Sequence, residues 1–232
     1  MNFGFGGYGI YLLFSLPALL LGFWAQIKVK GAIQKYSKIR TLTGYSGADV
    51  ARRMLDSNGL RDVNIEETRG FLSDHYDPRS KTLRLSPENY RGNSIAAAGI
   101  AAHESGHALQ HQENYFPLTI RSAMVPSVQI GSWLGPIIFI AGLLLNWINL
   151  AWVGIFLFGA TALFAIVTLP VEFNASNRAK AWLSTSGMIY QDESIGVKKV
   201  LDAAALTYVA AAIQAISTLL YYVFLLTGSR RD

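Results

Sequence analysis

Four long apolar stretches with few charges decide what this chain can fold into. They comprise residues 8–27, 128–147, 150–170 and 203–227. A helix needs about 20 apolar residues to cross the roughly 30 Å hydrocarbon core of a bilayer, and each stretch reaches that length. Long buried helices of a soluble protein would be interrupted by charges, yet no charged residue lies between Arg121 and Glu172. We therefore predict a mainly α, multi-pass membrane protein with about four transmembrane helices.

The basic residues predict on which side of the membrane the polar segments lie. Of the 20 Lys and Arg residues, 14 lie in residues 28–121 and 4 in residues 171–202. Cytoplasmic loops carry an excess of Lys and Arg, so both segments are predicted to be cytoplasmic. This topology accounts for the net charge of +5, and no nucleic-acid partner is expected. Arg230 and Arg231 follow the last stretch, so either the C-terminus is outside or that helix does not span.

These features divide the chain into five predicted parts. They are an N-terminal transmembrane anchor (1–27), a cytoplasmic domain (28–121), a transmembrane hairpin (122–170), a second cytoplasmic segment (171–202) and a C-terminal transmembrane helix with its tail (203–232). The anchor is expected to be retained, because Lys28 and Lys30 follow it and no basic residue precedes it, the reverse of a cleaved signal peptide. The absence of cysteine excludes disulfides, thiolate zinc ligands and cysteine nucleophiles.

The first cytoplasmic domain is predicted to be small and α+β. Ser46 and Asp49 form an N-cap signal for a short helix over residues 47–57. The runs "VNIEET", "FLSDHYDP" and "KTLRLSP" suit a small antiparallel sheet, in which the last run could be an edge that pairs with an extended substrate. From Ser94 the chain is rich in alanine and unbroken until Asn114, which predicts a helix of roughly five turns.

The stretch "HESGHALQH", residues 103–111, holds three of the chain's four histidines. On a helix, His103 and His107 share one face with Cβ atoms about 5–6 Å apart, so both imidazoles could bind one ion. Glu104 lies about 100° round the helix and could reach a water on that ion. This H-E-x-x-H pattern is typical of zinc peptidases, and about 0.002 occurrences are expected by chance in a chain of this composition. The alternative is a polar helix seam without metal.

A carboxylate should complete such a site, and Glu172 in "LPVEFNASNRAKAW" is the candidate. The 50 uncharged residues from 122 to 171 fit two membrane crossings, so Glu172 would return to the side of the histidines. Its alternative role is that of an ordinary carboxylate at a helix N-terminus after Pro170. His111 lies a further turn along the helix, and we expect it to face substrate, solvent or a ligand histidine without binding the ion.

Three motifs carry a resemblance to a known family. "DHYDPRSKTLRLS", "AAHESGHALQH" and "LPVEFNASNRA" resemble the YugP-type neutral zinc metallopeptidases, a bacterial family of membrane-embedded proteins, and the likeness covers nearly the whole chain. More distantly, the chain is similar to the HtpX and CAAX-processing membrane proteases, which are gluzincins. The resemblance implies a zincin-like cytoplasmic domain with one Zn²⁺ ion, His103, His107 and Glu172 as ligands and Glu104 as catalytic base. The distant relatives carry an aspartate where this chain has Ser176.

Three further residues are candidates for contact with substrate or transition state. His75, or its neighbour Tyr76, could donate a hydrogen bond to the oxyanion that forms during hydrolysis. Arg178 could do the same from the second cytoplasmic segment. The alternatives are a structural or solvated role for His75 and a charge at the membrane surface for Arg178.

The sequence thus predicts a zinc-dependent metalloendopeptidase of the bacterial inner membrane with its active site facing the cytoplasm. Its substrates would be peptides or membrane proteins, and its transmembrane helices would contact membrane lipid. One alternative is a zinc-stabilised scaffold that binds partner proteins without cleaving them. Another is an intramembrane site-2-type protease, whose L-D-G motif is matched only in part by Leu201-Asp202-Ala203.

Overall fold

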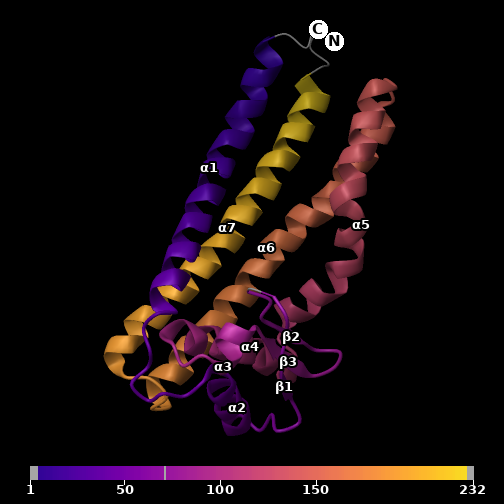
Figure 1. Cartoon of the computed structure of the whole chain (residues 1–232). Coiled ribbons are helices and arrows are strands. Elements are labelled where there is room, and N and C mark those ends of the chain that lie inside the picture. Colours follow the sequence, from indigo (N-terminus) through magenta and orange to yellow (C-terminus); the bar gives the residue numbers. More distant parts are fainter. Residues whose placement is uncertain (1–4, 71, 229–232) are drawn as a thin grey trace. The chain divides into compact units, whose positions relative to one another are not determined.

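The computed structural model describes residues 5–70 and 72–228, so Arg230 and Arg231 lie outside the described residues. Within these ranges the chain is mostly helical and has one three-stranded sheet (Figure 1). The elements in chain order are α1 Phe5–Tyr36, α2 Gly47–Ser57, β1 Asn64–Glu67, β2 His75–Asp77, β3 Thr82–Leu85, α3 Pro87–Arg91, α4 Ile95–Gln112, α5 Phe116–Leu144, α6 Ile148–Thr185 and α7 Gln191–Gly228.

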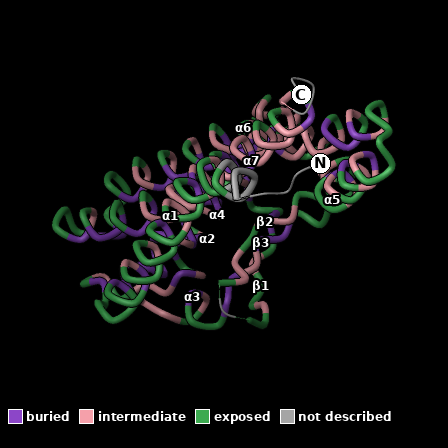
Figure 2. Tube along the Cα trace, turned by 90° about the horizontal axis from the view of Figure 1, so that it is seen from above, coloured by how far each residue is buried: buried purple, intermediate pink, exposed green. Residues whose placement is uncertain are grey.

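Four helices of the described chain are long and apolar enough to cross a membrane, which confirms the predicted number. They are Leu12–Tyr36 of α1, Phe116–Leu144, Ile148–Thr185 and Gln191–Gly228. Large apolar side chains along them are exposed, including Trp133, Leu144 and Phe156, and exposed positions recur along α1 and α5 in Figure 2. Apolar side chains that face outward suit a hydrocarbon solvent.

The helices α5 and α6 approach each other through glycine. A Cβ atom on Gly154 would lie 2.4 Å from the backbone nitrogen of Phe139, and one on Gly131 would lie 2.5 Å from the carbonyl oxygen of Leu157. Side chains larger than hydrogen would push the backbones apart at these positions. Small residues at such contacts are typical of helix pairs in membranes, where close packing replaces the hydrophobic effect.

By its contacts the chain divides into two compact units. The first comprises Met1–Ala25, Ile120–Leu169 and Thr207–Asp232, and the second comprises Gln26–Thr119 and Pro170–Leu206. The second unit holds the sheet, α2, α3 and α4, together with the polar ends of α1, α6 and α7. All the candidate site residues predicted from the sequence belong to this second unit.

The sheet differs from the prediction in its pairing. Its order is β1-β3-β2, with β2 antiparallel to β3 but β1 parallel to β3. The predicted edge strand β3 is therefore central, and the prediction that it pairs with substrate is wrong. Leu83 and Leu85 are fully buried and Thr82 is 2% exposed, whereas Glu66 and Glu67 on β1 are exposed. A strand buried to this extent takes the centre, and a charged one takes an edge.

The helices of the second unit begin where the sequence predicts. The capping box of Ser46 and Asp49 starts α2, and the hydroxyl of Ser94 accepts a hydrogen bond from the backbone N–H of Ala97 at 3.1 Å to start α4. The alanines of α4 are buried, and α4 packs against α2 and the strands β2 and β3. The short helix α3 was not predicted; it starts at Pro87, whose ring suits a first helical position.

Asp74 ties the segment before β2 to the end of β3. Its carboxylate accepts hydrogen bonds from the backbone N–H of Ser86 at 2.7 Å, from the hydroxyl of Ser86 at 3.1 Å and from the side-chain amide of Asn89 at 2.9 Å. Ser86 and Asn89 are 3% and 6% exposed, so these donors have little access to water.

We predict that Asp74→Ala destabilises the chain by about 2–4 kcal/mol, because three buried donors lose a charged acceptor. The unfolding midpoint of the detergent-solubilised chain, measured by scanning fluorimetry, should fall. Asp62→Ala is the matched control, since Asp62 forms an exposed ion pair with Lys81 and exposed pairs contribute little. Equal midpoints for the two variants would contradict the assigned role of Asp74.

Candidate metal centre

Three of the predicted residues converge on one point. His103 and His107 of α4 and Glu172 of α6 each offer one ligand atom, and these atoms all lie within 4.8 Å of one another. Within the described residues this is the group of histidine and acidic side chains that could hold a metal ion. The side chain of Glu172 is 3% exposed and those of the two histidines are 14% and 12% exposed. The centre is therefore nearly closed to solvent but reachable from the histidine side.

The backbones of α4 and α6 approach closely enough to bring these ligands together. A Cβ atom on Gly106 would lie 2.8 Å from the carbonyl oxygen of Ala175, so only glycine fits at this point of α4. Ala175 and Ala179 on α6 are fully buried. The small residues set the helix separation, and the four-residue spacing of the histidines then places both rings toward Glu172.

The separations of the two histidines from Glu172 suit a zinc ion, and all three candidate ligand atoms lie within 4.8 Å of one another. The Nε2 atoms of His103 and His107 lie 3.3 Å and 3.7 Å from the same oxygen, Oε2 of Glu172. Two ligands that each lie about 2.1 Å from zinc in a tetrahedron are about 3.4 Å apart. Two imidazoles and one carboxylate also leave one tetrahedral position open, as in catalytic sites and unlike the closed sites of structural zinc.

Each histidine has a neutral partner on its other ring nitrogen. The Nδ1 atom of His103 lies 3.1 Å from the hydroxyl oxygen of Ser176, and Nδ1 of His107 lies 2.9 Å from Oε1 of Gln110. With both Nδ1 atoms engaged, both Nε2 atoms are directed at the centre. Ser176, at the position where the distant relatives carry an aspartate, therefore contacts His103. Gln110 was missed, although its position three residues after His107 places it on the same helix face.

Glu104 lies beside the ligands on α4 and is half-buried. Burial lowers the pKa of His107, but its close contact with Glu172 and the charges of Glu104 and Glu172 outweigh that effect and raise the pKa above its usual value. An ion that binds His107 must compete with a proton for the imidazole, so zinc binding should weaken as the pH falls.

The remaining histidines lie outside the group of three. Nδ1 of His111 is 3.0 Å from the hydroxyl oxygen of Tyr76 on β2, which agrees with the expectation that His111 is not a ligand. His75 is exposed, and its Nδ1 lies 2.8 Å from the carbonyl oxygen of Ser73. Of the two neighbouring candidates His75 and Tyr76, Tyr76 is therefore the one whose side chain contacts α4. Burial, and next the charges of Asp62 and Asp77, raise the pKa of Tyr76 to about 12, so its hydroxyl remains a proton donor at physiological pH.

The other two predicted positions have ionic partners. The guanidinium of Arg178 forms two hydrogen bonds with Glu113 at 2.7 Å and 2.6 Å, and its Nε donates to Oδ1 of Asn174 at 2.7 Å. Asp202, the residue that a site-2-type protease would use, binds Lys180 and Lys198 and is absent from the candidate metal group of the described residues. The helix α4 is also not among the four candidate spans. The site-2-type alternative is therefore not favoured.

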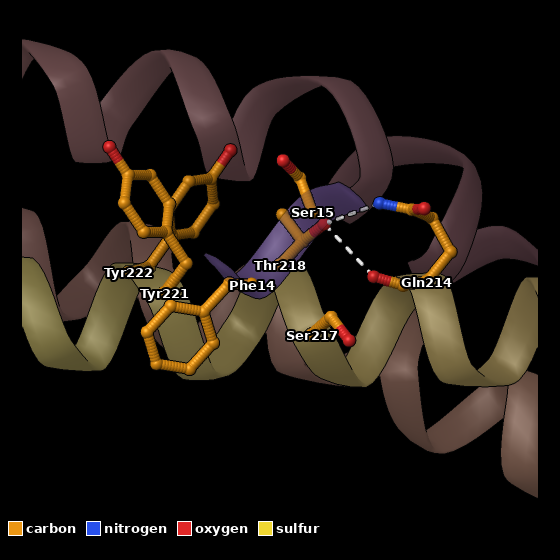
Figure 3. Close-up of a pocket in the computed structure, with 7 residues that line it drawn as sticks. All are labelled: Phe14, Ser15, Gln214, Ser217, Thr218, Tyr221 and Tyr222. Carbon is orange, nitrogen blue, oxygen red and sulfur yellow. Dashed lines mark hydrogen bonds between the residues drawn. The ribbon is translucent and has the colours of Figure 1, made fainter. Parts of the chain in front are cut away.

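A polar cavity of about 110 Å³ lies in the first unit (Figure 3). Phe14 and Ser15 of α1 line it together with side chains of α7, which are Gln214, Ser217, Thr218, Tyr221 and Tyr222. The hydroxyl of Thr218 donates to the carbonyl oxygen of Gln214 at 2.9 Å, within the same helix. The lining has no carboxylate, imidazole or basic group, so it offers no metal ligands or acid and base for hydrolysis.

We predict that His103→Ala and Glu172→Gln each abolish stoichiometric zinc binding. Removal of a residue that only hydrogen-bonds a metal ligand typically weakens metal binding by roughly 10–100-fold. Removal of a ligand itself should weaken binding more than that. Metal analysis of the purified chain after dialysis would measure this loss. His111→Ala and His75→Ala are the controls and should retain one ion per chain; zinc retention by the first two variants would show that the ligand set is wrong.

Comparisons with known proteins identify the family of the chain. A family model described as "Putative neutral zinc metallopeptidase" matches residues 11–227. Over 223 residues the chain is 49% identical to a protein of Bacillus subtilis (strain 168) named "Putative membrane protease YugP", which covers 96% of this chain and 99% of that relative. No solved structure matches the chain. The extent of both matches confirms the resemblance predicted from the motifs, and the chain belongs to the family described as "Putative neutral zinc metallopeptidase".

Proposed function

We propose that this chain is a zinc-dependent metalloendopeptidase that hydrolyses peptide bonds of membrane or membrane-proximal proteins. The observation that carries the proposal is the convergence of His103, His107 and Glu172 beside Glu104. Three protein ligands leave a position open for a water or substrate oxygen, which a structural scaffold does not need. Family membership and the name of the Bacillus subtilis relative support a protease over the scaffold.

The side chains of the centre have distinct roles in the proposed reaction. His103, His107 and Glu172 would hold one zinc ion, which supplies the Lewis acidity that lowers the pKa of water toward about 7 and polarises the scissile carbonyl. Glu104 accepts a proton from the attacking water as its oxygen bonds to the carbonyl carbon. When the C–N bond breaks, Glu104 returns that proton to the departing amine, so the carboxylate is restored after each turnover.

We further propose that Tyr76 assists this reaction. The neutral hydroxyl of Tyr76 reaches His111 on the helix of the candidate ligands, and β2 forms one edge of the sheet. A donor at this place could hydrogen-bond the oxyanion of the tetrahedral intermediate, and an extended substrate could add to the edge as a further strand. Arg178 stays a candidate for substrate contact, and that role would require it to release Glu113.

The distribution of Lys and Arg supports a cytoplasmic location for the centre. Residues 28–121 carry 14 of these residues, and Glu172 belongs to the other basic segment. Because the same helix, α6, carries an apolar stretch and Glu172, substrates would be segments of membrane proteins that emerge from the bilayer.

Glu104→Gln is predicted to abolish proteolysis and to retain zinc, because the amide cannot accept the proton but is not a ligand. The assay is cleavage of an unfolded protein, or of a solubilised membrane protein, by the full-length chain in detergent. We expect a rate loss of at least roughly 100-fold, within the range typical of a general base. Glu88→Gln serves as the control with the same substitution at an exposed glutamate of α3. If wild type binds zinc but cleaves nothing, the scaffold is favoured instead.

Tyr76→Phe is predicted to lower kcat by roughly 100–1,000-fold while zinc content and the pH of half-maximal zinc loading stay unchanged, because only a transition-state donor is lost. Steady-state cleavage rates and metal analysis measure the two effects. His75→Ala should cleave at the wild-type rate. A wild-type kcat for Tyr76→Phe would remove this residue from the mechanism and leave the metal centre unaffected.

A further inference from the structure

Gln110 is a fully buried polar side chain between the two helices that carry the candidate ligands. It lies on α4, is 0% exposed and has hydrogen-bond partners on both of its side-chain atoms. Its Oε1 atom is 2.9 Å from Nδ1 of His107, and its Nε2 atom is 2.8 Å from the carbonyl oxygen of Val171. Val171 directly precedes Glu172, so a single amide contacts one histidine and the backbone next to the carboxylate.

The chemistry of these partners fixes the orientation of the Gln110 amide. A backbone carbonyl can only accept a hydrogen bond, so the atom that faces Val171 must be the NH₂ group. The amide oxygen then faces His107, and an oxygen that only accepts requires a proton on Nδ1 of that imidazole. The lone pair of the neutral ring is consequently on Nε2, the nitrogen that lies 3.7 Å from Glu172.

A second acceptor holds the NH₂ group of Gln110 in place. Its Nε2 atom also donates to Oδ1 of Asn174 at 2.9 Å, and the same oxygen accepts from Nε of Arg178 at 2.7 Å. Arginine has donors only and stays charged, so the oxygen of Asn174 must face both groups. Glu113 fixes the far side of that guanidinium with two hydrogen bonds. The direction of every hydrogen bond from Arg178 to His107 is therefore determined.

We propose that Gln110 is the positioning residue that sets the ring orientation and tautomer of His107 for metal binding, with Asn174 and Arg178 fixing the amide of Gln110. The proposal rests on the proposed zinc centre, and it explains how the ring of His107 is held in place before an ion binds. Without these contacts the ring of His107 could rotate or protonate on Nε2, and both changes would remove the ligand atom from the centre. Because all its hydrogen bonds are satisfied, the buried amide of Gln110 can hold the ring of His107 without adding a charge to the site.

Full-length Gln110→Met and Asn174→Leu variants test the proposal in detergent, since both keep side-chain volume but lose the hydrogen bonds. Zinc affinity is measured by competition with a chromophoric chelator, and ligand geometry by the visible spectrum after cobalt substitution. We expect zinc affinity to fall by roughly 10–100-fold in both variants, with an altered cobalt spectrum. Asn174→Asp keeps the acceptor oxygen and should bind zinc at least as tightly as wild type.

Gln112→Met is the matched control, because Gln112 lies on the same helix but is exposed and contacts only the carbonyl oxygen of Asn58, at 3.4 Å. The proposal is overturned if Gln110→Met has the zinc affinity and cobalt spectrum of Gln112→Met. It is also overturned if Asn174→Asp binds zinc as weakly as Asn174→Leu, because the acceptor would then be irrelevant. Failure of the wild-type chain to bind zinc would instead refute the proposed metal centre itself.

Discussion

A carboxylate that is 3% exposed would be costly to bury without compensation, and the placement of Glu172 between two imidazoles provides that compensation. The contact requires α4 and α6 to approach at Gly106, where a side chain would meet the backbone of Ala175. It also requires both histidines on one face of α4, one turn apart. Three features of the sequence therefore serve one purpose, which is to bring three candidate ligands from distant segments together. They are the alanine-rich helix, Gly106 and the four-residue spacing of the histidines.

The position of Glu172 depends on helix continuity. The helix α6 runs without a break over Ile148–Thr185, although Pro170 lies inside it. Rotation and rise are fixed along a helix, so Glu172 and Ser176, four residues apart, share one face and contact His103 from the same side. Asn174 and Arg178, also four residues apart on α6, reach Gln110 and Glu113. The helix α6 thus supplies a candidate ligand, the partner of His103 and an acceptor for the amide that contacts His107.

Local signals were sufficient for the longer helices and the ligand candidates but insufficient for the short helix α3, the sheet pairing and the hydrogen-bond network. The capping residues Ser46 and Ser94 determine helix starts within a few residues of themselves, so α2 and α4 could be predicted. Pairing of β1 with β3 depends on burial of Leu83 and Leu85 by segments far along the chain, and no local pattern reports it. Gln110 meets partners 61 and 64 residues away, and its role follows from the direction of those hydrogen bonds.

The neutral partners of both histidines have a consequence for the proposed chemistry. A carboxylate that accepts from Nδ1 raises the basicity of a ligand imidazole and transfers electron density toward the ion. Ser176 and Gln110 are uncharged partners, so they orient His103 and His107 with less of this effect. An ion held by these rings would retain more positive charge, and Glu172 would be the main negative ligand that offsets it. In the proposed function, a zinc ion held here would strongly polarise a carbonyl oxygen and water, and the hydrogen bonds that fix the two rings would preserve that effect.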